Sequence, residues 1–254
     1  MAFGVWRRER MLYMQLSERF IMAYNRIDKQ LQKRARLDHY VGFSQLVRRV
    51  ARKDNMFAQF ADDLLEFAEL RNAIVHELVE PEQIIAEPHA SVVERIEQIA
   101  EIVERPPLVI PKFQREVYVV CSEDSILDVL ALAREHGYTQ FPVYDADDQF
   151  RGLLTDRCIA RWLTFELEKV MLNVIEDIAV ADVMVYDKTG GDNVSFLPQN
   201  ATVFDAYSEF EHHMVYDYPR LEAILITTNG RKNEKLLGII TPWDIFRLHP
   251  LNGG

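Results

Sequence analysis

The segment ELRNAIVHE, residues 69–77, places three polar side chains in an otherwise apolar helical run. Leucine, alanine, isoleucine and valine would suffice for an ordinary core helix, so Arg71, Asn72 and His76 suggest chemistry. Histidine has the side-chain pKa nearest neutrality, which suits it to proton transfer. Asn72 lies four residues before His76 on the same helix face, whereas Arg71 lies five residues before it, about 140° around the helix. One chain by itself therefore does not align Arg71 with His76.

A purely structural role is the alternative for these residues. Arg71 falls on the same helical stripe as Phe67 and Ile74, which favours a buried arginine paired with an acidic residue earlier in the helix. The acidic candidates are Asp62, Asp63 and Glu66. His76 would then only hydrogen-bond a neighbouring helix.

Length and composition favour a soluble protein of two domains. The chain has 254 residues, of which 48% are apolar and 27% charged, as in ordinary globular proteins. No apolar run approaches the ~20 residues of a membrane span, and the segment MAFGVWRRER lacks the apolar core of a secretory signal. Cys121 and Cys158 are too few for a disulfide framework or a metal cluster. We expect a cytoplasmic protein, with no membrane partner and no required metal.

Charge is distributed unevenly along the chain. Residues 1–53 hold 13 Lys/Arg against 4 Asp/Glu, and the remaining residues hold 16 against 36. Such asymmetry often marks an anion-binding face. The alternative is that the basic residues merely cover exposed helix faces.

Periodicity divides the chain near residue 105. Residues 1–105 carry helical patterns throughout, including a short helix capped by Ser44 and a longer one from about Met56 to Leu78. Pro106 and Pro107 then stop a helix and begin a linker at 106–111. Residues 112–175 and 176–250 each repeat the order strand, helix, strand, strand, helix. The predicted fold class is therefore α plus α/β: an N-terminal antiparallel helical bundle followed by a tandem βαββα pair whose copies pack together.

The doubled unit resembles the cystathionine-β-synthase (CBS) domain pair over about residues 112–250. The stretch GIITPWD, residues 238–244, fits the family signature Gly-apolar-apolar-Thr-x-x-Asp. In members that bind adenine nucleotides, the resemblance implies that the threonine hydroxyl and the helix N-terminus face the phosphate, while the aspartate accepts both ribose hydroxyls. The spacing suits this role, because Thr241 and Asp244 share the first helical turn.

The two copies differ at the ribose-binding position. The first copy reads GLLTDRC, with Cys158 in place of the aspartate, and a thiol cannot accept two hydroxyl donors. We therefore expect one competent site for AMP, ADP or ATP, built around Asp244. The resemblance implies further site residues: Tyr138 and Thr139 from the first copy, Pro242 beside Thr241, and Arg220 for the phosphates. Alternatively, Thr241 is only a helix N-cap and Asp244 only a first-turn carboxylate.

The helix that carries Arg71 to His76 resembles the HEPN family of helical domains, over roughly residues 10–105. Its hallmark is an arginine followed after four to six residues by a histidine, commonly with a polar residue such as Asn72 directly after the arginine. In active members the resemblance implies metal-independent RNA cleavage by the ribose 2′-hydroxyl. His76 would move a proton, and Arg71 would hold the charge that builds on the phosphate. Basic residues of the same domain would guide the RNA backbone: Arg48, Arg49, Arg52 and Lys53.

Two functional hypotheses follow. In one, the CBS pair binds an adenine nucleotide and controls a HEPN-like endoribonuclease that acts as a homodimer. In the other, the protein is a non-catalytic sensor whose helical bundle mediates dimerisation or partner binding.

Overall fold

The computed structural model divides the chain into two compact units, an amino-terminal unit of residues 1–107 and a carboxy-terminal unit of residues 108–254. The structure describes residues 14–37, 41–76, 87–171, 178–189, 191–215 and 220–246, and the side chains of residues 76, 167–171, 215 and 246 lie outside this description. Within these ranges, no helix has both the length and the apolar character needed to cross a lipid bilayer.

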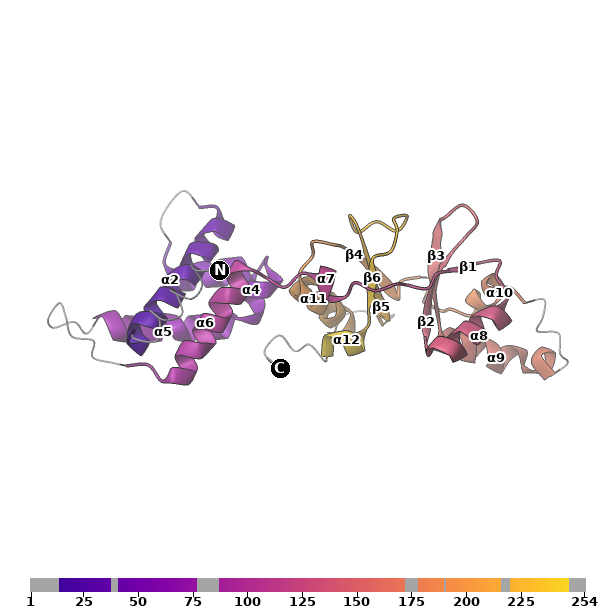
Figure 1. Ribbon diagram of the computed structural model, residues 1–254, viewed down its shortest axis with the longest axis horizontal. Coiled ribbons are helices and arrows are strands. Elements are labelled where there is room, and N and C mark those ends of the chain that lie inside the picture. Colours follow the sequence, from indigo (N-terminus) through magenta and orange to yellow (C-terminus); the bar gives the residue numbers. More distant parts are fainter. Residues whose placement is uncertain are drawn as a thin grey trace, which may run out of the picture. The chain divides into compact units, whose positions relative to one another are not determined.

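The described part of the amino-terminal unit is helical. Its helices are α2 (Leu16–Ala35), α3 (Phe43–Ala51), α4 (Asn55–Gln59), α5 (Ala61–His76) and α6 (Ala90–Glu104). Helix α2 packs along α6 and also contacts α3 and α5 (Figure 1). Apolar residues at helical spacing turn inward and are almost completely buried: Phe20, Ile27, Leu31, Leu46, Phe60, Leu64, Ile96 and Ile99. Two ion pairs cross from α2 to α6, Arg19–Glu97 at 2.6 Å and Arg26–Glu104 at 2.7 Å.

Two local expectations for this unit are wrong. The helix predicted from Met56 is interrupted at Phe60, whose φ of −106° and ψ of 6° end α4 before α5 begins. Asp54 caps α4 by accepting hydrogen bonds from two backbone N–H groups, and Phe57 and Phe60 are both fully buried around the break. Gly42, not Ser44, is the N-cap of α3. Leu78, the predicted end of the longer helix, lies outside the described residues.

The carboxy-terminal unit contains two small mixed sheets. The first copy comprises β1 (Val120–Cys121), α8 (Ile126–His136), β2 (Gln140–Tyr144), β3 (Phe150–Thr155) and α9 (Asp156–Met171). The second copy comprises β4 (Val194–Pro198), α11 (Val203–Val215), β5 (Ala223–Thr227), β6 (Gly238–Ile240) and α12 (Pro242–Phe246). In each copy the first two strands pair in parallel and the last two antiparallel. The described structure is thus a helical region followed by an α/β region.

A short segment ahead of each copy packs on the other copy. Helix α7 (Val109–Lys112) lies next to α11, and Val109 and Phe113 belong to the hydrophobic core of the second copy (Figure 1). Helix α10 (Val180–Met184) lies against the first copy, where Val180 and Val183 are fully buried. Each copy therefore completes its core with residues that precede the other copy in the chain.

This exchange explains the glycine of the sequence signature. The chain near Gln114 forms an antiparallel bridge with Gly238 at the start of β6. A Cβ atom at Gly238 would lie 2.2 Å from the backbone oxygen of Phe113, a distance that no side chain tolerates. Glycine is needed at residue 238 because the backbone of Phe113 and Gln114 passes directly over it.

Candidate nucleotide site

A cavity of about 360 Å³ opens between the two copies of the carboxy-terminal unit. It is lined by three segments: the extended chain 115–118 before β1, residues 137–140 between α8 and β2, and Ile239 and Thr241 at the end of β6. Gly137 ends α8 in the left-handed conformation, with φ of 70°, and so turns Tyr138 and Thr139 towards β2. The cavity volume falls in the lower part of the range of roughly 300–1,000 Å³ typical of small-molecule sites.

Asp244 is bonded to the rim of this cavity through two residues that line it. The backbone N–H and the hydroxyl of Thr241 both donate to Asp244 Oδ2, each at 2.8 Å. The Nη2 of Arg115 donates to the same oxygen at 2.9 Å. The carboxylate thus lies in a cluster of hydrogen-bond donors at the start of α12.

The bonds from Thr241 alone do not identify a ligand site. Thr202 and Asp205 begin α11 with the same pattern, in which the threonine N–H and hydroxyl donate to one carboxylate oxygen, both at 2.8 Å. This arrangement is a helix cap and agrees with the structural alternative for Thr241 and Asp244. Asp244 differs in its place beside the cavity, where it also pairs with the cavity-lining Arg115.

Aromatic rings form one wall of the cavity. Tyr118 and Tyr138 both line it, with ring centroids 5.1 Å apart, and His136 stacks on Tyr118 at 5.0 Å. Tyr138 remains 40% exposed, so its ring is available to a bound molecule. Such a surface suits a flat heterocyclic base.

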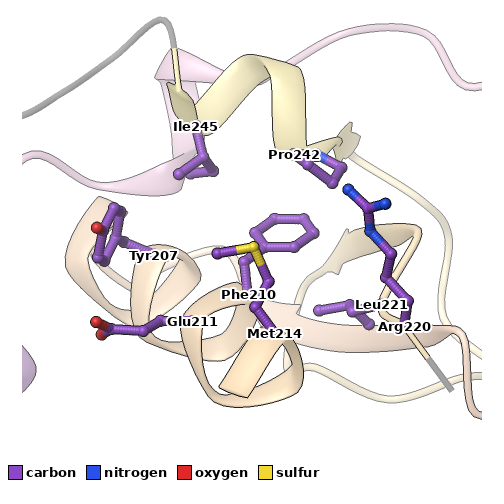
Figure 2. A pocket seen from close by; sticks show the side chains of 8 residues that line it. All are labelled: Tyr207, Phe210, Glu211, Met214, Arg220, Leu221, Pro242 and Ile245. Carbon is purple, nitrogen blue, oxygen red and sulfur yellow. The ribbon is translucent and has the colours of Figure 1, made fainter. Parts of the chain in front are cut away.

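The remaining two predicted nucleotide-binding residues line a different pocket. Arg220 and Pro242 line a small, mainly apolar pocket of about 20 Å³ between α11 and α12, together with Phe210, Met214 and Ile245. Figure 2 shows the Arg220 side chain extending towards Pro242 on one side of this pocket. The structure therefore brings Tyr138, Thr139, Thr241 and Asp244 together and separates Arg220 and Pro242 from the lining of the larger cavity.

Comparison with known proteins identifies the repeated unit. The CBS domain family matches residues 99–164 and 180–250, which is more than half of the chain. This chain belongs to the CBS domain family. The resemblance to a CBS pair is thereby confirmed, and no curated protein matches the sequence.

Solved structures with CBS domains show limited likeness to this chain. The CBS domains of a transcriptional regulator from Streptococcus pneumoniae share 18% identity, with a TM-score of 0.37, over 56% of this chain and 98% of that one. CBSX2 in complex with AMP shares 21% identity, with a TM-score of 0.37, over 56% and 94% of the two chains. The CBS pair of protein MJ0100, in complex with 5′-methylthioadenosine and S-adenosyl-L-methionine, shares 16% identity, with a TM-score of 0.39, over 56% and 95%. The family assignment rests on the sequence match alone.

The first CBS copy has no carboxylate at the position equivalent to Asp244. Cys158 is 2% exposed, its backbone N–H donates to the Thr155 hydroxyl at 3.1 Å, and its thiol donates to the Val183 backbone oxygen at 3.3 Å. Burial raises the pKa of this thiol to about 11, so it stays neutral at physiological pH. Cys158 is a core residue in the described structure.

The amino-terminal unit contains a second candidate site around Arg71 and Asn72. Both residues line an open depression of about 520 Å³. Its other walls come from α2 and the start of α3, including Asn25, Asp28 and Ser44. Partial burial raises the pKa of Asp28, while the positive charge of Arg71 opposes that rise. The depression therefore combines a cation, a carboxyl group and amide groups, whereas the His76 side chain lies outside the described structure.

The structure also bears on the predicted partners of Arg71. Asp63 pairs with Arg95 of α6, at 2.6 Å, rather than with Arg71. Arg71 is partly exposed, and Asn72 is exposed. Arg71 is therefore not completely buried, and the structural alternative keeps Asp62 and Glu66 as its candidate partners.

Basic residues gather at the adjoining ends of α2 and α3. They line a concavity of about 520 Å³ that includes Lys33, Arg34, Arg36, Arg49 and Lys53. Asp54 pairs with Arg34 at 3.2 Å and supplies the acidic member of this surface. Among the described residues, no group of three or more His, Cys, Asp or Glu side chains is arranged to hold a metal ion.

Proposed function

We propose that this protein is a regulatory sensor that binds an adenine nucleotide, AMP, ADP or ATP, in the cavity between its two CBS copies. CBS pairs are regulatory modules and often bind adenine nucleotides. The observation that carries the proposal is the convergence of Tyr138, Thr241 and the Asp244–Arg115 pair on one cavity.

Each group has a distinct role in this proposal. The Asp244 carboxylate accepts the ribose hydroxyls, since an ionised carboxylate offers acceptor sites on two oxygens. The Thr241 hydroxyl faces the phosphate, and the base lies against the rings of Tyr118 and Tyr138. The contribution of Arg220 to phosphate binding stays a prediction, because this residue lines the other pocket.

Isothermal titration calorimetry with AMP, ADP and ATP tests this proposal. We expect Asp244→Ala to weaken binding at least tenfold, because a hydrogen bond to a charged group contributes about 1.5–3 kcal/mol. Asp205→Ala is the matched control, since it removes the same type of helix cap outside the cavity. Cys158→Ala should also leave the affinity nearly unchanged. Equal affinities for the wild type and Asp244→Ala would remove Asp244 from the site.

We further propose that the CBS pair controls a HEPN-like amino-terminal domain that cleaves RNA. The depression that Arg71 and Asn72 share with Asp28 supports this candidate function, and the basic concavity supplies a surface for an RNA backbone. His76 transfers the proton, Arg71 binds the phosphate, and cleavage leaves a cyclic phosphate.

Cleavage assays with single-stranded RNA test the ribonuclease proposal. His76→Ala should lower the rate by ~10²–10⁴, the usual loss when general acid–base catalysis is removed. His89→Ala is the control histidine, because His89 is the N-cap of α6 and does not belong to the Arg71–His76 motif. Cleavage should persist in EDTA, and an adenine nucleotide should change its rate. If the wild type leaves varied RNAs intact with and without nucleotide, the alternative stands: a sensor whose bundle mediates dimerisation or partner binding.

A further inference from the structure

Arg115 is hydrogen-bonded to Asp244, whose carboxylate binds the ribose in the proposed function. Its Nη2 donates to Asp244 Oδ2 at 2.9 Å and to the backbone oxygen of Ile239 at 2.5 Å. The backbone N–H of Arg115 donates to the Leu237 oxygen at 3.3 Å, which attaches the residue to the segment leading into β6. The guanidinium is therefore placed at Asp244 by backbone contacts and by its own hydrogen bonds.

Asp244 Oδ2 already accepts three hydrogen bonds in this arrangement. Two come from Thr241, which lies in the same turn, and the third comes from Arg115. A ribose that uses both carboxylate oxygens must therefore displace a donor. Arg115 is the donor that can leave, because the Thr241 bonds are part of the helix cap whereas Arg115 belongs to a different segment.

The ion pair is exposed enough to exchange with a ligand. The side chains of Arg115 and Asp244 are 44% and 26% exposed, and Arg115 lines the cavity. Exposed ion pairs contribute little net stability, so a ligand can replace this one at small cost. The displaced guanidinium still lines the cavity, where it offers hydrogen-bond donors to an anion.

We propose that Arg115 makes the site selective for nucleotides over nucleosides. This inference rests on the proposed nucleotide binding. Without ligand, the guanidinium covers the ribose-binding carboxylate. A ligand with a 5′-phosphate displaces it and then pairs with it, since arginine binds phosphate through two parallel hydrogen bonds. Adenosine and 5′-methylthioadenosine displace the same ion pair but offer no anion in return.

The ratio of affinities for AMP and adenosine tests this inference. Wild type, Arg115→Ala and Arg157→Ala are titrated by calorimetry with AMP, adenosine and 5′-methylthioadenosine. We expect Arg115→Ala to weaken AMP binding at least tenfold while adenosine and 5′-methylthioadenosine bind as tightly as before or more tightly. Arg157 is the matched control, because it is a similarly exposed arginine that pairs with Glu222 at 2.8 Å and does not line the cavity. Thermal melting of each variant reports whether it is folded.

Each outcome separates this inference from the proposed function. If the ratio of the affinities for AMP and adenosine falls towards one in Arg115→Ala but not in Arg157→Ala, the role of Arg115 is supported. An unchanged AMP-to-adenosine ratio in Arg115→Ala overturns that role, and nucleotide binding survives if Asp244→Ala still weakens both ligands. A wild type that binds neither AMP nor adenosine overturns the proposed function and this inference with it.

Discussion

A place beside a cavity makes one of two similarly bonded aspartates a candidate binding group. Asp205 and Asp244 accept the same two hydrogen bonds from a threonine three residues earlier. Asp244 in addition meets Arg115 at a cavity. At the scale of single residues, the Thr-x-x-Asp motif specifies a helix cap, and a residue far away in the chain makes one instance a candidate binding group.

The two cysteines should differ in their reactivity. Cys121 is partly exposed, with its pKa raised by its hydrogen bond to Glu123, whereas Cys158 is buried with a pKa of about 11. The thiolate is the reactive form, so Cys158 should resist modification in the folded protein. A chromogenic disulfide reagent at pH 8 should detect one thiol per native chain and two after denaturation. Cys121→Ser should abolish the native reaction, and rapid loss of both thiols in the native protein would contradict the burial of Cys158.

Exchange of short segments is the main feature at the scale of elements. Helix α7 contributes Val109 to the core of the second copy, and α10 contributes Val180 and Val183 to the core of the first. The predicted units 112–175 and 176–250 are each continuous in the chain. Each hydrophobic core, in contrast, combines residues of one copy with a short segment that precedes the other copy. A substitution in α7 should therefore destabilise the second copy, and a substitution in α10 should destabilise the first copy.

Val183 and Val185, which lie two residues apart in the chain, provide a test of this packing. Val183 in α10 is fully buried in the core of the first copy, and Val185 just beyond it is 79% exposed. Val183→Ala should lower the free energy of unfolding by about 1–3 kcal/mol, because it leaves a cavity. Val185→Ala should change it by less than about 0.5 kcal/mol. Urea denaturation measures both, and equal effects would show that α10 does not pack as described.

The whole molecule is expected to act as a homodimer. Arg71 and His76 lie about 140° apart around one helix, so a second chain is needed to bring such residues together. A tandem CBS repeat also presents surfaces that a symmetric partner would cover. Sedimentation at micromolar concentration should give about twice the monomer mass of 29.7 kDa. A clean monomer would remove the basis for an active site shared between two chains.

Local patterns in the sequence determined much of the fold. Helical periodicity located the amino-terminal helices, and alternation of short strands with helices located the two CBS copies, because both patterns depend on neighbouring residues. The GIITPWD stretch made Thr241 and Asp244 candidates for the same reason, since the motif lies within one strand end and one helical turn. Local pattern was insufficient at Phe60, where the helix breaks beside two fully buried aromatic rings within an otherwise continuous helical pattern.

Only the tertiary structure decided which residues meet at the cavity. Arg115 and Asp244 are 129 residues apart, and no periodicity or spacing relates two positions at such a distance. Arg220 stays a predicted phosphate ligand, and the structure shows that it lines another pocket. The pairing of the two copies and the exchange of α7 and α10 set these contacts, and they depend on packing between segments far apart in the chain.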